Sequence, residues 1–472
     1  MKNIKLINLQ FSIPVWVLTL ASISFSACKD DIEVGKIDEN NYAVGEGSFA
    51  YINDSNGKHI FSNVEFRNEG NISLYLNVQR KLSAASSVAV SYDQSVLNRY
   101  NAENNAAYEA FPENLVTLDN NGTITLKAGE IKSSGMKISL TTGTSLSYEK
   151  SYVIPLRIKV VSGDFKLSQR DETKLIFVKD LTKLPDCNKA SGVKVFSCME
   201  VNDTNPLNNL SFTLKSTGQC LVDVLIIFSA NINYNEATGR VYIFNNENVQ
   251  ALLDNRQHYL KPLQDRGMKI ILGLLGNHDR SGISNLSKET AKAFAKEVKA
   301  MCDAYQLDGI FVDDEYSKYQ TPPPPGFVSP SSAAAARLCY EVKQAQPERW
   351  VIAYAYSTTY GLPAVDGVKS GEFVDYALHD YGGSSDLSSS YPGMPKSNMG
   401  LYSQEFAQGR IASEANLKRM RTDGYLSHMI FAMDPNRYNF STQTTAMERM
   451  ARAFYDDELV FDGIKYPKDW NK

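Results

Sequence analysis

The arrangement of apolar and polar residues changes near residue 190 and divides the chain into two parts. From about residue 33 to residue 180, apolar and polar positions alternate in short runs, as at 72–78 and 136–140. Turn sequences such as Asn120-Asn121-Gly122 separate these runs. Alternation with a period of two, interrupted by Asn/Gly turns, is typical of antiparallel strands that bury one face. We therefore predict an N-terminal antiparallel β-sandwich.

The second part alternates between apolar strands and amphipathic helices. We expect strands at 194–201, 221–230, 268–275, 307–312, 350–356, 373–378, 399–402 and 426–433. Eight strands with intervening helices in about 280 residues fit an α/β fold, the (β/α)8 or TIM barrel. A doubly wound open sheet is the alternative, but no glycine-rich phosphate turn supports it.

Helices are expected between several of these strands but not between all of them. Amphipathic patterns occur at 249–264, 291–305, 332–346 and 444–454. The connections 357–372 and 382–397 are instead rich in Gly, Ser, Pro and Tyr, which is typical of loops. We therefore predict a barrel that lacks some outer helices and is open on one side, which suits a large branched ligand.

An apolar strand that leads directly into acidic residues is the strongest chemical signal in the chain. The strand at 307–312 is followed by Asp313, Asp314 and Glu315. In parallel α/β folds the carboxyl ends of the strands carry the chemistry. Alternation places Phe311, Asp313 and Glu315 on one face, with the Cα atoms of the two acids about 6.6 Å apart. Neighbouring like charges raise one pKa, which keeps a carboxylic acid protonated near neutral pH.

Composition and charge exclude several classes of function. The hydrophobic fraction of 43% and the charged fraction of 22% are ordinary for a soluble globular protein. A net charge of −4 gives no basic excess, so nucleic acid is not an expected partner. The cysteines after residue 28 form no CxxC pairs, and we therefore expect no metal site, no cofactor and buried thiols. We expect a monomer.

The N-terminus has the features of an export signal. Lys2 and Lys5 precede an apolar stretch at 11–23, and small residues lead to Cys28. This arrangement resembles the lipobox of bacterial lipoproteins, in which Cys28 would become the lipidated first residue. The following Lys29-Asp30-Asp31 resembles the signal that directs Bacteroides-type lipoproteins to the cell surface. We expect a lipid anchor in the bacterial outer membrane; a plain secretory signal is the alternative.

These patterns define four segments of the chain. Residues 1–27 form the predicted signal peptide, and residues 28–180 the predicted sandwich. Residues 181–190 are a predicted linker, and residues 191–472 the predicted barrel. The sandwich contains no clustered acids, histidines or nucleophiles, so we expect the chemistry in the barrel.

Further candidate site residues follow the predicted strands at their carboxyl ends. They combine amides, acids and aromatic rings, without a metal cluster or a GxSxG nucleophile turn. Such a set suits carbohydrate, because rings stack on sugar faces while polar groups bind hydroxyls. The candidates for substrate binding are Asn277, Tyr356, Asp380, Tyr381, Tyr402 and Met433.

The segment 307–316 resembles the DGxDxDxE signature of glycoside hydrolase family 18. It is most similar to the endo-β-N-acetylglucosaminidase branch, whose motif continues as Asp-Asp-Glu-Tyr. The sequence 275–278 (Leu-Gly-Asn-His) and the helix-poor middle of the barrel also match that branch. The N-terminal part resembles the sandwich found ahead of such barrels in Bacteroides surface lipoproteins, and is expected to act as a spacer or a glycan-contacting module.

The resemblance implies a retaining, substrate-assisted cleavage of the GlcNAc-β-1,4-GlcNAc bond in the core of N-linked glycans or glycoproteins. Glu315 would be the general acid and later the base. Asp313 would orient the 2-acetamido group of the substrate, whose oxygen is the nucleophile, and Tyr381 would hydrogen-bond that oxygen. Asp308, which opens the motif, would belong to the substrate-binding set.

One residue departs from the family motif. Phe311 stands where the family has an aspartate beneath the catalytic pair that shares a proton or hydrogen bond with the equivalent of Asp313. The departure keeps two alternatives open: a non-catalytic glycan-binding protein on the same scaffold, and a chitinase-like hydrolase. The low number of tryptophans, three in all, argues against a processive chitin cleft.

Overall fold

The computed structural model describes residues 48–60 and 63–471. The predicted signal peptide and the lipidation candidate Cys28 lie outside these residues. Of the helices in the described part, none is long and apolar enough to cross a membrane.

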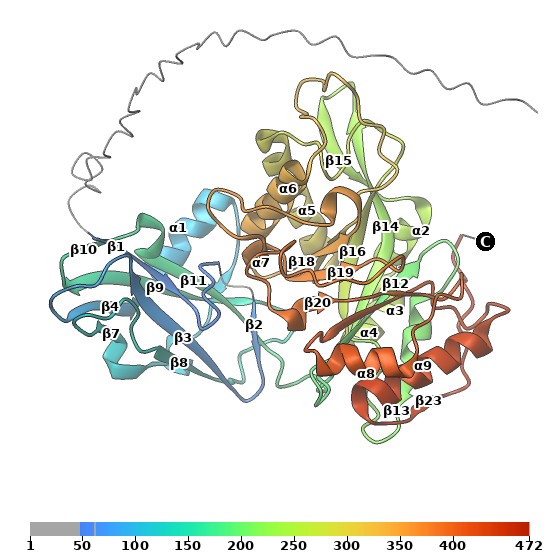
Figure 1. Ribbon diagram of the computed structural model, residues 1–472, viewed down its shortest axis with the longest axis horizontal. Helices are drawn as coiled ribbons and strands as arrows, with labels where there is room; N and C mark the ends of the chain where they lie inside the picture. Colours follow the sequence, from blue (N-terminus) through green and yellow to red (C-terminus); the bar gives the residue numbers. More distant parts are fainter. Residues whose placement is uncertain (1–47, 61–62, 472) are drawn as a thin grey trace, which may run out of the picture. The chain divides into compact units, whose positions relative to one another are not determined.

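Two β-sheets form the N-terminal part of the described chain (Figure 1). The first has the order β10 (Phe165–Leu167), β1 (Ser48–Asn53), β3 (Glu69–Val78), β8 (Met136–Thr141) and β6 (Val116–Leu118). The second has the order β2 (Val64–Phe66), β11 (Thr173–Asp180), β9 (Tyr152–Ser162), β4 (Ser86–Tyr92) and β7 (Thr123–Leu126), with β5 (Glu109–Ala110) paired to β9. Helix α1 (Gln94–Asn104) follows β4.

The two N-terminal sheets share one apolar cluster, to which Ile52 and Leu74 contribute from one sheet and Val88 and Ile154 from the other. The prediction of purely antiparallel pairing is wrong, because β1–β10, β2–β11 and β5–β9 pair in parallel. In each of these pairs one partner has only two or three residues. Strands this short show no alternation from which their pairing could be predicted.

The C-terminal part contains a larger sheet whose pairs are parallel except for one hairpin. Its order is β20 (Met399–Gly400), β19 (Tyr376–His379), β18 (Trp350–Ala355), β17 (Gly309–Val312), β16 (Lys269–Gly276), β14 (Val224–Asn235), β12 (Lys194–Glu200), β22 (Ser427–Phe431) and β21 (Gln404–Glu405). Strand β15 (Arg240–Phe244) forms the hairpin with β14. Each predicted strand has a counterpart. The predicted strand at 399–402 pairs only over Met399–Gly400, as β20, and β21 follows β20 after three residues. A separate two-stranded sheet joins β13 (Phe212–Leu214) and β23 (Leu459–Phe461).

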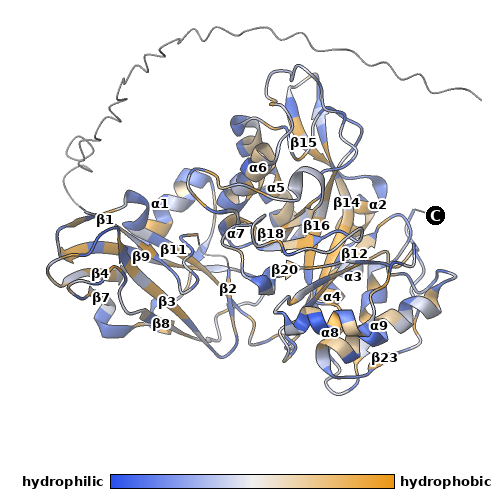
Figure 2. Ribbon diagram, in the orientation of Figure 1, coloured by the Kyte–Doolittle hydropathy of each residue, from blue (hydrophilic) through white to orange (hydrophobic). Residues whose placement is uncertain are grey.

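The two faces of the parallel sheet bury different clusters. One face contributes residues such as Ile310 and Val312 to a cluster shared with the helices. The other face contributes residues such as Phe196, Ile226 and Phe311 to a cluster built from strands alone. Figure 2 shows these strands as mostly hydrophobic, as expected for a sheet buried on both faces.

The helices confirm most of the predicted pattern. Those on the sheet are α2 (Glu247–Asp254), α3 (Arg256–Tyr259), α4 (Lys261–Asp265), α5 (Lys288–Tyr305), α6 (Ser332–Ala345), α7 (Ser370–Phe373), α8 (Glu414–Thr422) and α9 (Phe440–Tyr455). The prediction of one helix at 249–264 is wrong: Asn255 caps the end of α2, and Pro262 stands in the first turn of α4, because proline cannot donate the backbone bond of a helix interior. Connections 357–372 and 382–397 contain no helix longer than the four residues of α7.

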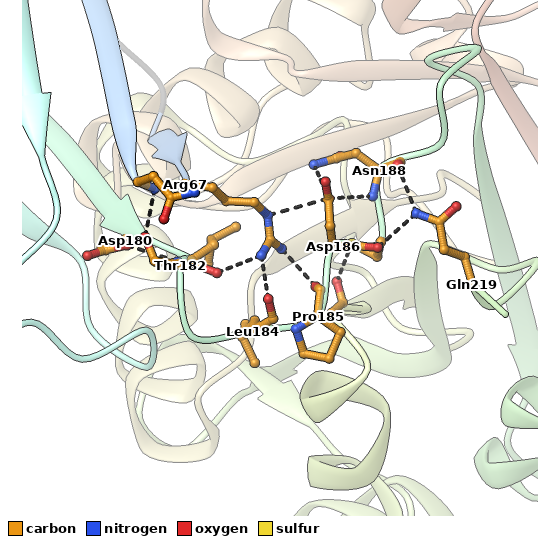
Figure 3. Close-up of polar contacts among 12 residues, drawn as sticks. Arg67, Asp180, Thr182, Leu184, Pro185, Asp186, Asn188 and Gln219 are labelled. Carbon is orange, nitrogen blue, oxygen red and sulfur yellow. Dashed lines mark hydrogen bonds and ion pairs between the residues drawn. The ribbon is translucent and has the colours of Figure 1, made fainter. Parts of the chain in front are cut away.

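The predicted linker after β11 is held by one arginine. Arg67 Nη1 donates to the carbonyl oxygens of Leu181 and Leu184 at 2.6 and 2.5 Å, and Nη2 donates to that of Pro185 at 2.8 Å (Figure 3). Gln219 Nε2 donates to the carbonyl oxygens of residues 186 and 188. The backbone carbonyls of the segment are therefore bound by side chains from both parts of the chain.

Candidate active site

The acidic run begins where β17 ends, at the carboxyl edge of the parallel sheet. Strand β17 pairs in parallel with β16 and β18. Phe311 faces the strand-only cluster, and Val312 faces the helices. Alternation continues the face of Phe311 into Asp313, and the charge of Asp313 acts on the Cys198 thiol of the same cluster. Asp313 thus lies above Phe311.

Asp313 is a buried carboxyl without a neutralising partner. Its side chain is 3% exposed, and its Oδ1 atom has no hydrogen-bond partner among the described residues. Burial raises the pKa of Asp313 well above its usual value, and the charges of Glu315 and Asp314 raise it further. The neutral form is therefore favoured until a donor approaches.

Glu315 is the more accessible of the two acids. Burial raises its pKa and Asp314 adds to the increase, while a hydrogen bond from Tyr316 opposes it. The backbone that follows Glu315 is held by the loop after β16, because the amide of His278 donates to the carbonyl oxygen of Tyr316 at 2.8 Å. A partly exposed carboxyl with a raised pKa suits proton donation to a bound substrate.

Asp314 points away from the other two acids and holds the loop. It is buried and accepts hydrogen bonds from the hydroxyls of Tyr319 and Thr358. The Tyr319 hydroxyl also accepts a bond from Ser284 Oγ at 3.0 Å. The middle acid of the run therefore connects the loops that follow β16, β17 and β18.

Aromatic rings occupy the layer beneath the acids. Phe311 contacts Phe228 and Tyr354, with ring centroids 6.2 and 5.9 Å apart. Phe228 contacts Phe431 at 5.2 Å, and Phe431 contacts Tyr381 at 6.3 Å. A continuous aromatic layer therefore extends from Phe311 to Tyr381. It includes the position of Phe311, where the family motif has a carboxylate.

Tyr381 and Asp380 follow β19 and lie near the acids. Burial raises the pKa of Tyr381, and the charge of Glu315 contributes to the increase. The Arg410 guanidinium lies 5.3 Å from the Tyr381 ring centroid. Asp380 Oδ1 lies 2.7 Å from His379 Nδ1. The structure thus brings Tyr381 into the surroundings of Glu315.

The remaining candidates differ in placement. Asn277 lies at the same edge, where its Nδ2 donates to Asn233 Oδ1 at 3.1 Å. Tyr356 is 42% exposed, and its ring contacts that of Tyr354. Tyr402 lies near Asp380, whose charge acts on the Tyr402 hydroxyl. Met433 is different: it is 2% exposed and belongs to the cluster shared with the helices, so its predicted contact with substrate is wrong.

The structure does not bring Asp308 to the candidate site. Asp308 precedes β17 and lies at the opposite end of the strand from Asp313. It accepts a bond from the amide of Ile270 at 2.9 Å and lies 3.7 and 3.6 Å from the amines of Lys179 and Lys269. Burial acts to raise the pKa of Asp308, but the two lysines outweigh burial and lower it. The predicted substrate-binding role of Asp308 is therefore wrong.

Two residues at this edge were missed in the sequence. Tyr354 lies within a predicted strand and shares the face of Tyr356, so the alternation applied to Phe311 and Asp313 could have found it. Glu200 is the last residue of β12. Burial raises its pKa to about 7, and the charge of Asp203 contributes to the increase. Its position at the carboxyl end of a predicted strand was the available signal.

No group of three or more His, Cys, Asp or Glu side chains in residues 48–60 and 63–471 could hold a metal ion. What the edge offers instead is two carboxyls with raised pKa values directly after one strand, surrounded by tyrosines and amides. A partly exposed acid beside a buried acid, with aromatic rings for sugar faces, suits the chemistry of a glycosidase.

Comparisons with known proteins specify the class. A family model described as a "-like, N-terminal domain" matches residues 41–164. The chain is 60% identical over 282 residues to endo-beta-N-acetylglucosaminidase F1 of Elizabethkingia meningoseptica, covering 59% of this chain and 83% of the relative. It is 32% identical over 237 residues to the endo-beta-N-acetylglucosaminidase of Flavobacterium sp. (strain SK1022), covering 50% and 73%.

A solved structure matches over most of the chain. The crystal structure of Bacteroides thetaiotamicron EndoBT-3987 with Man5GlcNAc product has a TM-score of 0.81 and 34% identity, covering 89% of this chain and 97% of the other. The complex of the same enzyme with Man9GlcNAc2Asn substrate matches with a TM-score of 0.75. The chain belongs to the endo-β-N-acetylglucosaminidase family and is a glycosidase.

Proposed function

We propose that the protein cleaves the GlcNAc-β-1,4-GlcNAc bond in the core of N-linked glycans by the retaining, substrate-assisted mechanism of glycoside hydrolase family 18. The observation that carries this proposal is the placement of Glu315 and Asp313 at the carboxyl end of β17, both with raised pKa values. The solved relative was crystallised with Man5GlcNAc and Man9GlcNAc2Asn, which supports an N-glycan substrate.

In the proposed first step, Glu315 donates its proton to the glycosidic oxygen. The 2-acetamido oxygen of the same sugar attacks the anomeric carbon from the opposite face, and the bond to the leaving sugar breaks. Asp313 faces the acetamide nitrogen and stabilises the positive charge that develops there, while Tyr381 donates to the acetamide oxygen. Glu315 then removes a proton from water. The water oxygen attacks the anomeric carbon and opens the oxazolinium ring formed in the first step, with retention of configuration.

We infer further that the parallel sheet closes into a (β/α)8 barrel. Strands β12 and β19 are five places apart in the sheet order, which in a flat sheet is about 24 Å. The ring centroids of Phe196 in β12 and Tyr376 in β19 are 5.1 Å apart, which supports a sheet curved onto itself. Only residues 401–403 separate β20 from β21, the two ends of the order.

We propose the outer membrane as the location of the protein, on the basis of the sequence. Cys28 would carry the lipid anchor, and the acidic residues after it would direct the protein to the cell surface. Labelling of the cells with a lipid precursor, and loss of that label in Cys28→Ala, would test the anchor.

The activity is tested with two variants that carry the same change in the same three-residue context. Glu315→Gln removes the proposed acid, and we expect glycan release from a high-mannose glycoprotein to fall at least 1,000-fold, because the leaving group then departs without a proton. Glu458→Gln, at an exposed residue of the run 456–458, is the control and should release glycan at the rate of the wild type.

Release assays on complex-type glycoproteins and on chitin oligomers define the substrate class. Release from chitin alone would favour the chitinase-like alternative. Glycan binding without release, in the wild type as well as in Glu315→Gln, would contradict the proposed function.

A further inference from the structure

Tyr354 lies beside Asp313 on the neighbouring strand. Strands β17 and β18 pair with Val312 opposite Ala353, which places Asp313 and Tyr354 at the next level toward the carboxyl edge. Tyr354 is 4% exposed and belongs to the strand-only cluster. Its ring packs on that of Phe311, with centroids 5.9 Å apart. The ring is therefore fixed in the layer directly beneath the acids.

The hydroxyl of Tyr354 lies among the groups assigned to the acetamide of the substrate. Burial raises the pKa of Tyr354, and of the surrounding charges Asp313 contributes most, ahead of Tyr381 and Asp380. Asp313 comes from the strand on one side of β18, and Asp380 and Tyr381 from the strand on the other. The hydroxyl thus lies between Asp313 on one side and Asp380 and Tyr381 on the other.

Asp313 needs a donor when it is ionised. Its Oδ1 atom is buried and has no hydrogen-bond partner in the described part of the chain, and a buried carboxylate without donors is costly. Phe311 beneath it offers only hydrocarbon. The titratable groups that face Asp313 are Glu315 and Asp314 from its own segment, Cys198 from β12, Tyr316, and Tyr354 from β18.

Only some of these groups can stabilise a negative charge. Glu315 and Asp314 repel it, and the Cys198 thiol is a weak donor. Tyr316 is 57% exposed, whereas Tyr354 is buried next to Asp313. Tyr354 is therefore the buried hydroxyl donor on this side of the site.

We propose that Tyr354 donates a hydrogen bond to Asp313 when Asp313 is ionised opposite the positively charged acetamide, and so supplies the partner that Phe311 cannot. The inference rests on the proposed function and names Tyr354 as a positioning residue that acts through Asp313. In the free enzyme the two residues lie at the same level, side by side at the ends of adjacent strands, and such hydrogen bonds tighten when substrate binds.

Tyr354→Phe tests the inference, because it keeps the ring and removes only the hydroxyl. We expect kcat to fall 10- to 100-fold, the range for a hydrogen bond to a charged group, with KM within twofold. Loss of the donor raises the pKa of Asp313, so the acidic limb of the kcat/KM profile should move to higher pH. Tyr376→Phe, in the same cluster but near the amino end of β19, is the matched control and should leave both quantities unchanged.

A double-mutant cycle separates this role from a structural one. In an Asp313→Asn background, which has no charge to stabilise, adding Tyr354→Phe should reduce kcat less than twofold further. Three outcomes would overturn the inference. The first is a double variant whose loss of kcat is the product of the two single losses. The others are a rise in KM alone, and a Tyr354→Phe enzyme with the kcat and pH profile of the wild type. Failure of the proposed function would be seen differently, as undiminished release by Glu315→Gln.

Discussion

At the end of β16, a Cβ atom on Gly276 would overlap with the carbonyl oxygen of Glu315 and would lie 2.7 Å from the amide nitrogen of Ser317. The backbone that carries the proposed acid is thus seated directly on this glycine. We expect Gly276→Ala to displace Glu315 and to reduce kcat 10- to 100-fold, because displacements of about 1 Å have effects of this size. Steady-state kinetics on a glycoprotein substrate measures the change.

Gly383→Ala provides the comparison for this prediction. It adds the same methyl group where the nearest atom would be in the His379 ring at 3.8 Å, an ordinary contact. A Gly276→Ala enzyme as active as Gly383→Ala would mean that the loop accommodates the methyl group and that Glu315 does not depend on it.

Strand alternation predicted that Asp313 shares the face of Phe311, and the charge of Asp313 acts on Cys198 of the cluster on that face. Met433 was proposed only because it ends the predicted strand at 426–433; the left-handed Ala432, with a φ of 56°, interrupts the strand before it, and Met433 packs in the cluster shared with the helices. Asp308 was misplaced for another reason. A motif read as one unit does not show that its first and last acids lie at opposite ends of a strand.

At the scale of single elements, the two ends of β17 have different roles. The carboxyl end carries the acids, and the amino end carries an ion cluster of Asp308, Lys179 and Lys269. A Cβ on Gly309 would overlap with the Trp350 carbonyl, so the glycine allows β18 to approach closely. The first two residues of the motif are therefore structural.

Asp308→Asn separates these roles. The variant keeps an acceptor for the Ile270 amide but removes the charge from two lysines, and we expect unfolding free energy at pH 7 to fall by roughly 3 kcal/mol. Since the pKa of Asp308 is lowered in the folded state, its contribution is present above its ordinary pKa and is lost as the pH falls through the lowered value. Urea unfolding at pH 7 and pH 3 should show a difference that shrinks at pH 3. Reduced kcat with unchanged stability would contradict the assignment.

Element types were predictable where patterns were long, as in α5, whose predicted apolar face is the buried one. The pairing of short strands and the breaks between α2, α3 and α4 were not, since they depend on single residues such as Asn255 and Pro262. The shortness of β20 and the unpredicted strand β21 likewise have no signal in hydrophobicity, because they depend on which neighbours each strand meets.

At the scale of the whole molecule, the chain from Ser48 onward forms one compact unit by its internal contacts. Polar contacts join residues far apart in sequence: the Tyr108 hydroxyl donates to Glu348 at 2.8 Å, and the amide of His59 donates to Glu372 at 2.8 Å. Glu65 of β2 pairs with Lys269 of β16. Glu348 and Glu372 are buried, so loss of these contacts leaves a buried carboxyl with fewer hydrogen-bond donors.

We therefore expect the N-terminal sheets and the catalytic part to unfold together. Differential scanning calorimetry of the chain from residue 48 should give a single transition, with a calorimetric enthalpy equal to the van't Hoff enthalpy. Tyr108→Phe should lower the midpoint of that one transition, because Glu348 is buried and loses its donor. Two separate transitions, with Tyr108→Phe affecting only the first, would show that the sheets are an independent module. In that case the ion pair of Lys179 in β11 with Asp308 would not couple the two parts.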